Sequence, residues 1–189
     1  MNWIQFGRLI HSIYSHNGKL PDLDWIQRLG LLAVKLGQVH ALRSDFLEPA
    51  KCEHLSKLFR NNHSMGAEDF MKLVESTAVP GFISHFEDIE KNSLASASVG
   101  QVHIGTLKDG TKVVIKAVKK DVRKNFKRDV SSVRGLFKFI SFFYRKLKRV
   151  GNPEAILNDI EEYTLSELDL NKEVDGVKVL SLIKEEDKD

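Results

Sequence analysis

The sequence predicts an α+β protein in which helices come first, antiparallel strands follow and two more helices end the chain. Three observations predict this order. Apolar residues recur at helical spacing before residue 80, the pattern becomes strand-like from Phe86 with β-branched residues up to Val118, and helical spacing returns from about Asp121. With 189 residues, 42% of them hydrophobic, the chain can build one domain, or one small domain with an extension.

Residues 1–80 are predicted to form a helical extension. The helices expected there cover residues 1–20, Asp22–Leu42, Pro49–Phe59 and Ala67–Ser76. The first is weak and stops at His16-Asn17-Gly18. The second is expected as one amphipathic helix interrupted by Gly30 and Gly37. A helix-interior glycine costs about 1 kcal/mol relative to alanine, so a glycine there indicates close approach by another segment.

Residues 81–189 are predicted to form a second unit that begins with a sheet. Val99–Leu107 and Val113–Val118 have the composition of strands, and Lys108-Asp109-Gly110 between them is a hairpin signal. Together with the strand-like segment from Phe86, they predict at least three antiparallel strands.

Two helices are expected after the sheet. The first begins at about residue 121 and carries one apolar stripe. The chain breaks at Gly151, where Asn152 can cap a helix that has Pro153 at its first position. That long helix is expected from Glu154 to Leu182.

The charge is unevenly distributed, although the formal net charge is only +3. Residues 116–149 hold 13 Lys and Arg against two Asp, and residues 153–189 hold 12 acids against four Lys. Such asymmetry occurs in nucleic-acid-binding arms. Both segments also carry apolar residues at helical spacing, and base-stacking aromatics among basic strands are not evident. Two helix faces that compensate each other are favoured, and no nucleic-acid partner is expected.

The cysteine count and the hydropathy limit which metal sites, disulfides and cellular locations can be expected. The single cysteine, Cys52, excludes an intrachain disulfide, and no Cys/His cluster has zinc spacing, so no metal site is assigned. No apolar run approaches the roughly 18 residues that span a bilayer. The first 20 residues lack acids, as in transit peptides, but hold too few Arg and Ser to identify one. A cytoplasmic location is expected, with peripheral inner-membrane association and organellar targeting left open.

A candidate phosphate site lies in LASASVGQVH, residues 94–103. Phosphate sites need exposed backbone N–H groups, unobstructed approach and a cation. The small side chains that supply this are Ala95, Ser96, Ala97 and Ser98, followed by Gly100, with Val99 between them as part of the same loop. The alternative is an ordinary hairpin loop, because Ala/Ser-rich loops are common.

Lys116 is the candidate cation. It ends VVIK in a strand that should be buried on one face, where an unpaired ammonium is costly. In a kinase small lobe the compensating anions are a nucleotide phosphate and a glutamate of the following long helix. Glu173 is the candidate glutamate. The alternative is a strand-end lysine that extends into solvent.

The segment SELDLNKE, residues 166–173, supplies candidate acids. Asp169 and Glu173 are four residues apart and share a helix face, whereas Glu167 points elsewhere. In VKLGQ, Lys35 and Gln38 share a face of an earlier helix, and Lys35 could reach Glu167 and Asp169. The alternatives are a solvated acidic face and two polar residues on an exposed helix edge.

The order and spacing of these segments resemble the UbiB-type atypical kinase-like family of ubiquinone biosynthesis, over roughly residues 25–185. The segments that carry the resemblance are KLGQ at 35–38, ALRSDFL at 41–47, LASASVGQVH at 94–103, VVIK at 113–116 and ELDLNKE at 167–173. That family has a K-x-G-Q signature in a helical extension, an Ala-rich loop in place of a Gly-rich one, a strand Lys, and an E-x-D motif followed four residues later by a helix Glu.

The resemblance implies a role for each matching residue. The implied catalytic residues are Lys116 as phosphate anchor, Glu173 as its helix partner, and Glu167 and Asp169 as the E-x-D acids. The implied nucleotide-binding residues are Lys116 and Ala95 to Gly100, where Ser96 replaces the usual Ala. The signature residues Lys35, Gly37 and Gln38 are implied to lie across the active site, in space that a protein substrate would need.

The resemblance also implies a fold and a function. Residues 1–80 would be the helical extension and residues 81–189 a protein-kinase-like small lobe, with the C-lobe absent, because only 16 residues follow Glu173 and no H-x-D or D-x-G segment is among them. The implied cofactor is ATP or ADP with Mg²⁺, whose ligands lie mainly outside the chain. The implied function is the N-terminal part of an ATPase that supports coenzyme Q biosynthesis.

The resemblance further implies three kinds of partner: adenine nucleotide, a missing C-lobe or partner chain, and membrane-associated quinone-biosynthesis proteins. The alternative is a catalytically inactive nucleotide-binding or scaffolding lobe that needs a partner chain. An open reading frame that continues into the missing acids would favour the enzyme.

Overall fold

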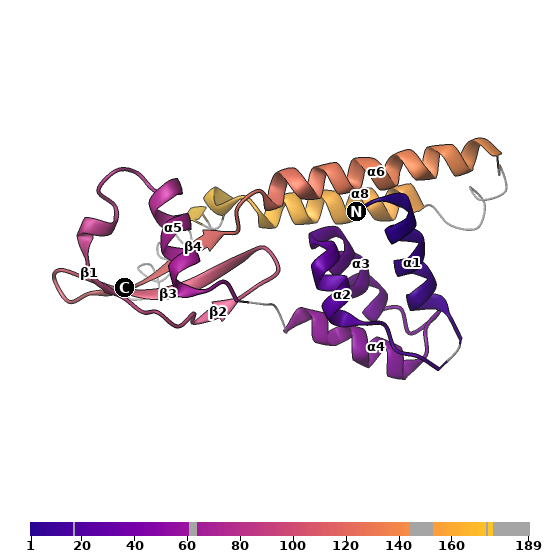
Figure 1. Cartoon of the computed structure of the whole chain (residues 1–189), viewed down its shortest axis with the longest axis horizontal. Helices are drawn as coiled ribbons and strands as arrows, with labels where there is room; N and C mark the ends of the chain where they lie inside the picture. The colour runs from indigo at the N-terminus through magenta and orange to yellow at the C-terminus, as the bar shows by residue number, and fades with distance from the viewer. Residues whose placement is uncertain (17, 61–63, 144–152, 173, 176–189) are drawn as a thin grey trace, which may run out of the picture.

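The computed structural model describes residues 1–16, 18–60, 64–143, 153–172 and 174–175 (Figure 1). The elements are α1 (Trp3–Tyr14), α2 (Leu23–Leu29), α3 (Leu31–Ala41), α4 (Pro49–Ser56), η1 (Lys57–Phe59), α5 (Ala67–Thr77), η2 (Ile83–His85), β1 (Phe86–Ile89), β2 (Ala95–Ser96), β3 (Gly100–Leu107), β4 (Lys112–Val118), α6 (Val122–Phe143) and α8 (Pro153–Glu167). None of the helices in these ranges has the length and hydropathy needed to cross a bilayer.

Local capping explains where several helices begin. The Asn2 side chain accepts a hydrogen bond from Gln5 N at 2.9 Å while the Gln5 side chain accepts one from Asn2 N, which forms a capping box at the start of α1. Asp22 caps α2 by accepting from Trp25 N. Helices α4 and α8 both begin with proline, whose missing N–H is unneeded there.

The sheet is antiparallel and is built around β3. Strand β4 pairs with β3 from Gly100↔Val118 to Thr106↔Lys112, whereas β1 and β2 each pair with a short part of β3. The β3–β4 turn needs a residue with positive φ, and Gly110 supplies it at φ 83°. The predicted hairpin and the prediction of at least three antiparallel strands are confirmed.

Two apolar clusters hold the fold together. In the larger one, which we call the helical core, α1–α4 pack against α6 and α8, and the two long helices run side by side (Figure 1). In the smaller one, the sheet core, Phe70 and Val74 of α5 pack against Ile115 of β4. Helix α5 thus belongs to the sheet by its packing, although it precedes the sheet in sequence.

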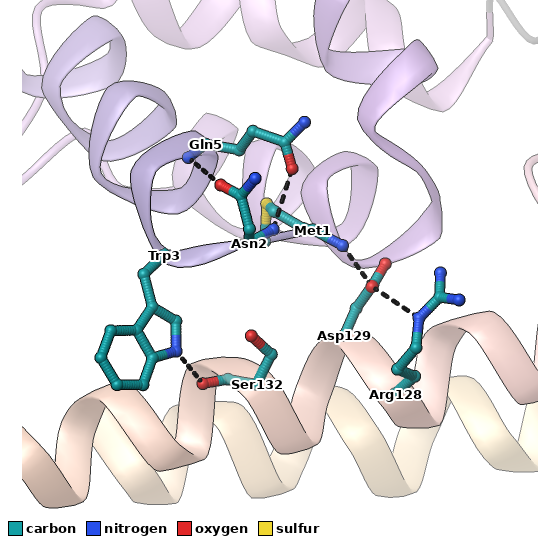
Figure 2. Close-up of polar contacts among 7 residues, drawn as sticks. All are labelled: Met1, Asn2, Trp3, Gln5, Arg128, Asp129 and Ser132. Carbon is teal, nitrogen blue, oxygen red and sulfur yellow. Dashed lines mark hydrogen bonds and ion pairs between the residues drawn. The ribbon is translucent and has the colours of Figure 1, made fainter.

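Helix α1 is anchored onto α6 by polar contacts as well as by apolar packing. Figure 2 shows the α-ammonium group of Met1 paired with the Asp129 carboxylate, whose side chain is 6% exposed. Beside it, Trp3 Nε1 donates to the carbonyl oxygen of Ser132 at 2.9 Å. These contacts join the first residues of the chain to the middle of α6.

The prediction of one helix over Asp22–Leu42 is wrong at one of its two glycines. Gly30 takes φ 108°, a conformation that L side chains rarely adopt, and it separates α2 from α3. Gly37 lies inside α3 without breaking it. A Cβ there would lie 2.5 Å from Leu58 Cδ1, so the predicted close approach at Gly37 is confirmed.

The prediction of one continuous helix from Glu154 toward Leu182 is also wrong. Helix α8 ends at Glu167, Leu168 forms a turn, and Asp169 lies outside helix before helical structure resumes at residue 170. The expected shared face of Asp169 and Glu173 assumed an unbroken helix, so that argument fails. Glu173 itself, and residues 176–189, lie outside the described residues.

Candidate functional site

A cleft of about 620 Å³ lies where α3, η1, the loop after β2, β4 and α8 meet. This volume falls within the range of small-molecule sites, roughly 300–1,000 Å³. The residues that line it are Lys35, Gln38, Val39, Leu42, Phe59, Ala97, Ser98, Val99, Lys116, Asp159, Ile160, Tyr163, Thr164 and Glu167. Four segments that the sequence singled out, far apart in the chain, therefore meet in one place.

The cleft separates the predicted site residues into two groups. Those that line it are Lys35, Gln38, Ala97, Ser98, Val99, Lys116 and Glu167. Those that do not are Gly37, Ala95, Ser96, Gly100 and Asp169. Glu173 lies outside the described residues, so its pairing with Lys116 stays a prediction.

An ion pair joins the two helices that form one side of the cleft. Lys35 Nζ of α3 lies 2.5 Å from Glu167 Oε2 of α8, and the two side chains are 12% and 30% exposed. Lys35 Nζ also lies 5.3 Å from the ring centroid of Tyr163. Charge-assisted hydrogen bonds of this kind are stronger than neutral ones. The interpretation of Lys35 as a residue on an exposed helix edge is therefore wrong.

Gln38 and Gly37 act on the cleft through η1, because both contact Leu58. Gln38 is buried, and its Nε2 donates to the carbonyl oxygen of Leu58 at 3.0 Å. Gly37 lets Leu58 approach α3 closely. Together they hold η1 against α3 and place Phe59 at the cleft, so an exposed helix edge is also the wrong interpretation for Gln38.

The loop after β2 is a tight reversal. Ala97 N donates to Gly100 O at 2.8 Å, and β2 pairs with β3 immediately before it. A Cβ on Gly100 would lie 2.7 Å from Ala117 O, so glycine is required for β3 to approach β4. Ala97, Ser98 and Val99 are thereby presented to the cleft, while Gly100 serves the sheet.

Lys116 lies on β4, opposite Val102 of β3, and forms the sheet side of the cleft. Its side chain is half-buried. The cleft thus contains Lys116 from the sheet and Lys35 from α3. The Glu167 carboxylate is paired with Lys35.

Sequence reasoning missed several residues of the cleft. Phe59, Asp159 and Tyr163 carry no motif that sets them apart from other surface residues. Thr164 is fully buried, and its Oγ1 has no hydrogen-bond partner among the described residues. A threonine within an apolar stripe is typical of core packing, so no signal in the sequence identified Thr164 as a cleft residue.

Comparison with known proteins places these features in a family. The profile of the ABC1 atypical kinase-like domain matches residues 57–183. A protein named "Probable protein kinase UbiB" from Haemophilus ducreyi is 31% identical over 154 residues, which cover 79% of this chain and 28% of that protein. The protein of the same name from Aeromonas salmonicida is 30% identical over 177 residues, 88% of this chain and 32% of that one. The chain therefore spans about three tenths of the length of these relatives.

Solved structures also match the chain, among them the complex of Rv3197 with erythromycin from Mycobacterium tuberculosis. It is 19% identical, covers 79% of this chain and 37% of its own, and superposes with a TM-score of 0.46. That likeness is too low to support an inference about fold or function.

The family profile spans more than half of the chain, and it covers the sheet, the loop after β2, Lys116 and Glu167. The prediction of a helical extension with an α+β, protein-kinase-like small lobe is confirmed by this match together with the observed antiparallel sheet and long helices. The chain belongs to the ABC1 atypical kinase-like family, which includes proteins of the UbiB type.

Proposed function

We propose that the chain is the helical extension and nucleotide-binding small lobe of a UbiB-type atypical kinase or ATPase, and that the cleft binds adenine nucleotide. One observation carries this proposal. Lys116, the loop residues Ala97–Val99 and the Lys35–Glu167 pair converge on a single cleft from separate parts of the chain. A cation and a loop of small residues with accessible backbone N–H groups are what phosphate binding requires.

The residues of the cleft fit a nucleotide. The small side chains of Ala97 and Ser98 leave the loop backbone accessible to phosphate oxygens, and Lys116 supplies the positive charge. Apolar walls from Val39, Val99 and other residues would cover a purine ring. We assign the implied phosphate-anchoring role to Lys116 and the loop contacts to Ala97, Ser98 and Val99, with Ala95, Ser96 and Gly100 supporting that loop.

Bound Mg²⁺ would neutralise negative charge on the phosphates. Asp159 and Glu167 are the carboxylates that line the cleft, and Glu167 is already paired with Lys35. Within the described ranges no group of three or more His, Cys, Asp or Glu side chains could hold a metal ion. We propose that the remaining Mg²⁺ ligands come from a C-lobe, and that Asp169 and Glu173 complete the acidic side of the site.

The Lys35–Glu167 pair gives the extension its proposed role. Because it bridges α3 and α8 at the cleft, it occupies space beside the nucleotide that a large substrate would need. We propose that the signature residues Lys35 and Gln38, with Gly37, restrict the site to nucleotide turnover rather than phosphorylation of a protein.

We propose that the partners are a C-lobe, on a longer chain or on a separate one, and quinone-biosynthesis proteins at the inner membrane. The chain spans about three tenths of the length of its UbiB relatives, so the acids that act in catalysis would come from the remainder. Support of ubiquinone biosynthesis is then the function of the completed protein.

Nucleotide titration of the 189-residue chain tests the proposal. ADP and ATP, each with and without Mg²⁺, are titrated calorimetrically into the wild-type chain and into Lys116→Met. Lys112→Met is the matched control, because Lys112 lies on the same strand but is exposed and outside the cleft. The wild type and Lys112→Met should bind, and Lys116→Met should bind at least about tenfold more weakly, a loss of about 1.4 kcal/mol.

Absence of binding by the wild type, or equal binding by Lys116→Met, would contradict the proposal. Hydrolysis measured on the same samples separates the enzyme from the binding module. We expect weak or absent hydrolysis by the chain alone. Turnover that is lost in Lys116→Met would show instead that the chain is active without a partner.

A further inference from the structure

Thr164 is a buried polar residue that the proposed function leaves unexplained. Its side chain is fully buried, and its Oγ1 has no hydrogen-bond partner among the described residues. It lies within α8, where its own carbonyl oxygen accepts from Leu168 N at 3.1 Å. A buried helical threonine can donate to the carbonyl four residues earlier, but Thr164 makes no such bond.

The surroundings of Thr164 do not satisfy this hydroxyl. The residues one and two turns earlier on the same face of α8 are Ile160 and Leu157, both members of the helical core. Buried polar groups in proteins are nearly always hydrogen-bonded, because leaving one unpaired costs free energy. Valine has almost the same shape and carries no such cost, so packing alone does not account for threonine at this position.

Thr164 is fully buried, and it is also among the residues that line the cleft. It is flanked along α8 by other cleft residues, Ile160 one turn before it and Glu167 one turn after it. Glu167 carries the ion pair with Lys35. Thr164 therefore lies on α8 between an apolar residue of the cleft and the residue that carries its ion pair.

We propose that Thr164 is a ligand-binding residue whose hydroxyl hydrogen-bonds the nucleotide bound in the cleft. This inference rests on the proposed function. A threonine hydroxyl offers one donor and accepts through two lone pairs, so a phosphate oxygen or a ribose hydroxyl can satisfy it. Because the hydroxyl is covered in the free protein, the cleft walls adjust as the contact forms.

The proposal makes two predictions of opposite sign for one substitution. Replacing Thr164 with valine removes an unsatisfied polar group, so the melting temperature of the free protein should stay equal or rise. The same change removes a ligand contact, so the affinity for ADP should fall by about fivefold or more. If Thr164 had only a structural role, the substitution would not lower the ADP affinity while leaving the melting temperature equal or higher.

The experiment compares Thr164→Val with two controls in the full chain, by thermal unfolding without ligand and by ADP titration. Thr164→Ser keeps the hydroxyl and should bind ADP like the wild type. Thr77→Val removes a helical threonine hydroxyl that does have a partner, Leu73 O at 2.7 Å, and lies outside the cleft. It should bind ADP normally and gain no stability.

Two results would overturn the inference while the proposed function stands. The first is ADP affinity in Thr164→Val equal to that of the wild type. The second is a clear loss of melting temperature in Thr164→Val, which would mean that the hydroxyl is already satisfied in the free protein. Failure of the wild-type chain to bind any adenine nucleotide would instead overturn the proposed function, and the inference with it.

Discussion

The helical core and the sheet core hold the two sides of the cleft by different means. Among the described residues, 17 buried apolar residues form the helical core, and it carries α3 and α8. The sheet core has three, Phe70, Val74 and Ile115, although it supports the loop after β2 and Lys116. Apolar burial therefore stabilises the helical side strongly, and the sheet side must depend on other interactions.

Hydrogen bonds stabilise the sheet side, where few apolar residues are buried. Gln101 accepts from Met65 N at 2.7 Å and donates to Met65 O at 3.0 Å. It also donates to His103 Nε2 at 2.8 Å, because His103 Nδ1 donates to Glu90 O at 2.7 Å and so carries the proton. The His103 ring stacks on Phe70 with centroids 3.7 Å apart. We call Gln101 and His103 the polar clamp; both are 1% exposed.

The comparison shows how one cleft combines a fixed wall and an adaptable wall. Large apolar clusters resist local opening, whereas regions with few buried apolar contacts open at lower free energy. The backbone of the helical wall, with Lys35 and Glu167, is expected to stay fixed, so that only side chains around Thr164 shift when its hydroxyl contacts a ligand. The sheet wall, with Ala97–Val99 and Lys116, is expected to adjust around a ligand.

The largest effect is expected from breaking the helical core. Phe126 on α6 is 1% exposed, and Phe126→Ala should lower the free energy of unfolding by about 3–5 kcal/mol. Urea unfolding measures the loss. Phe142→Ala, on the same helix at 81% exposure, is the control and should cost much less. Similar losses for the two variants would mean that the helical core is not the main source of stability.

An intermediate and local effect is expected from breaking the polar clamp. Gln101→Leu leaves Met65 N and O and His103 Nε2 without their partner. Met65 is half-buried, so water can satisfy its backbone groups, and the cost is about 1–3 kcal/mol, for the buried His103 Nε2. Hydrogen exchange should accelerate in β3 and α5 while α3 stays protected. Gln38→Leu is the matched change in the helical region, where it removes the bond to Leu58 O. It should loosen η1 instead, and the same exchange pattern for both variants would contradict the comparison.

The smallest effect is expected from the pH dependence of stability that His40 on α3 contributes. Burial lowers the pKa of His40 below its usual value of 6.5, against the opposing effect of its hydrogen bond to Leu36 O. The unfolded chain therefore takes up a proton at this site more readily than the folded one. The stability that His40 contributes is present above pH 6.5 and is lost as the pH falls below it toward the folded pKa.

Urea unfolding at pH 7.5 and pH 5.5 tests this prediction. The difference in stability between the two pH values should shrink in His40→Gln. His85→Gln is the control, because His85 is exposed. If the difference in stability between the two pH values is the same in His40→Gln as in the wild type, His40 does not contribute to the pH dependence.

Much of the fold was predictable from the sequence, because the spacing of apolar residues and the residues that form turns and caps act over short segments of the chain. The β3–β4 hairpin followed from Lys108-Asp109-Gly110, and the start of α8 from Pro153. The break at Gly30 was harder to predict, since glycine either interrupts a helix or permits close packing within it, as Gly37 does. The end of α8 before Asp169 has no glycine or proline to mark it.

The candidate site was predictable where its residues carry a motif. Lys116, the loop after β2, and the pair of Lys35 and Glu167 all stand out by residue type and spacing, and they meet in the cleft. Thr164 does not stand out, because whether a threonine has a partner depends on tertiary packing. The roles of Asp169 and Glu173 stay predictions.

The central claim is that the two regions build one nucleotide site, and hydrogen exchange of the full chain with and without ADP tests it most directly. Protection should appear together in the loop after β2, in β4 around Lys116 and in α8 between Asp159 and Glu167, while α1 and α4 stay unchanged. Protection confined to one region, or no change at saturating ADP, would contradict the claim.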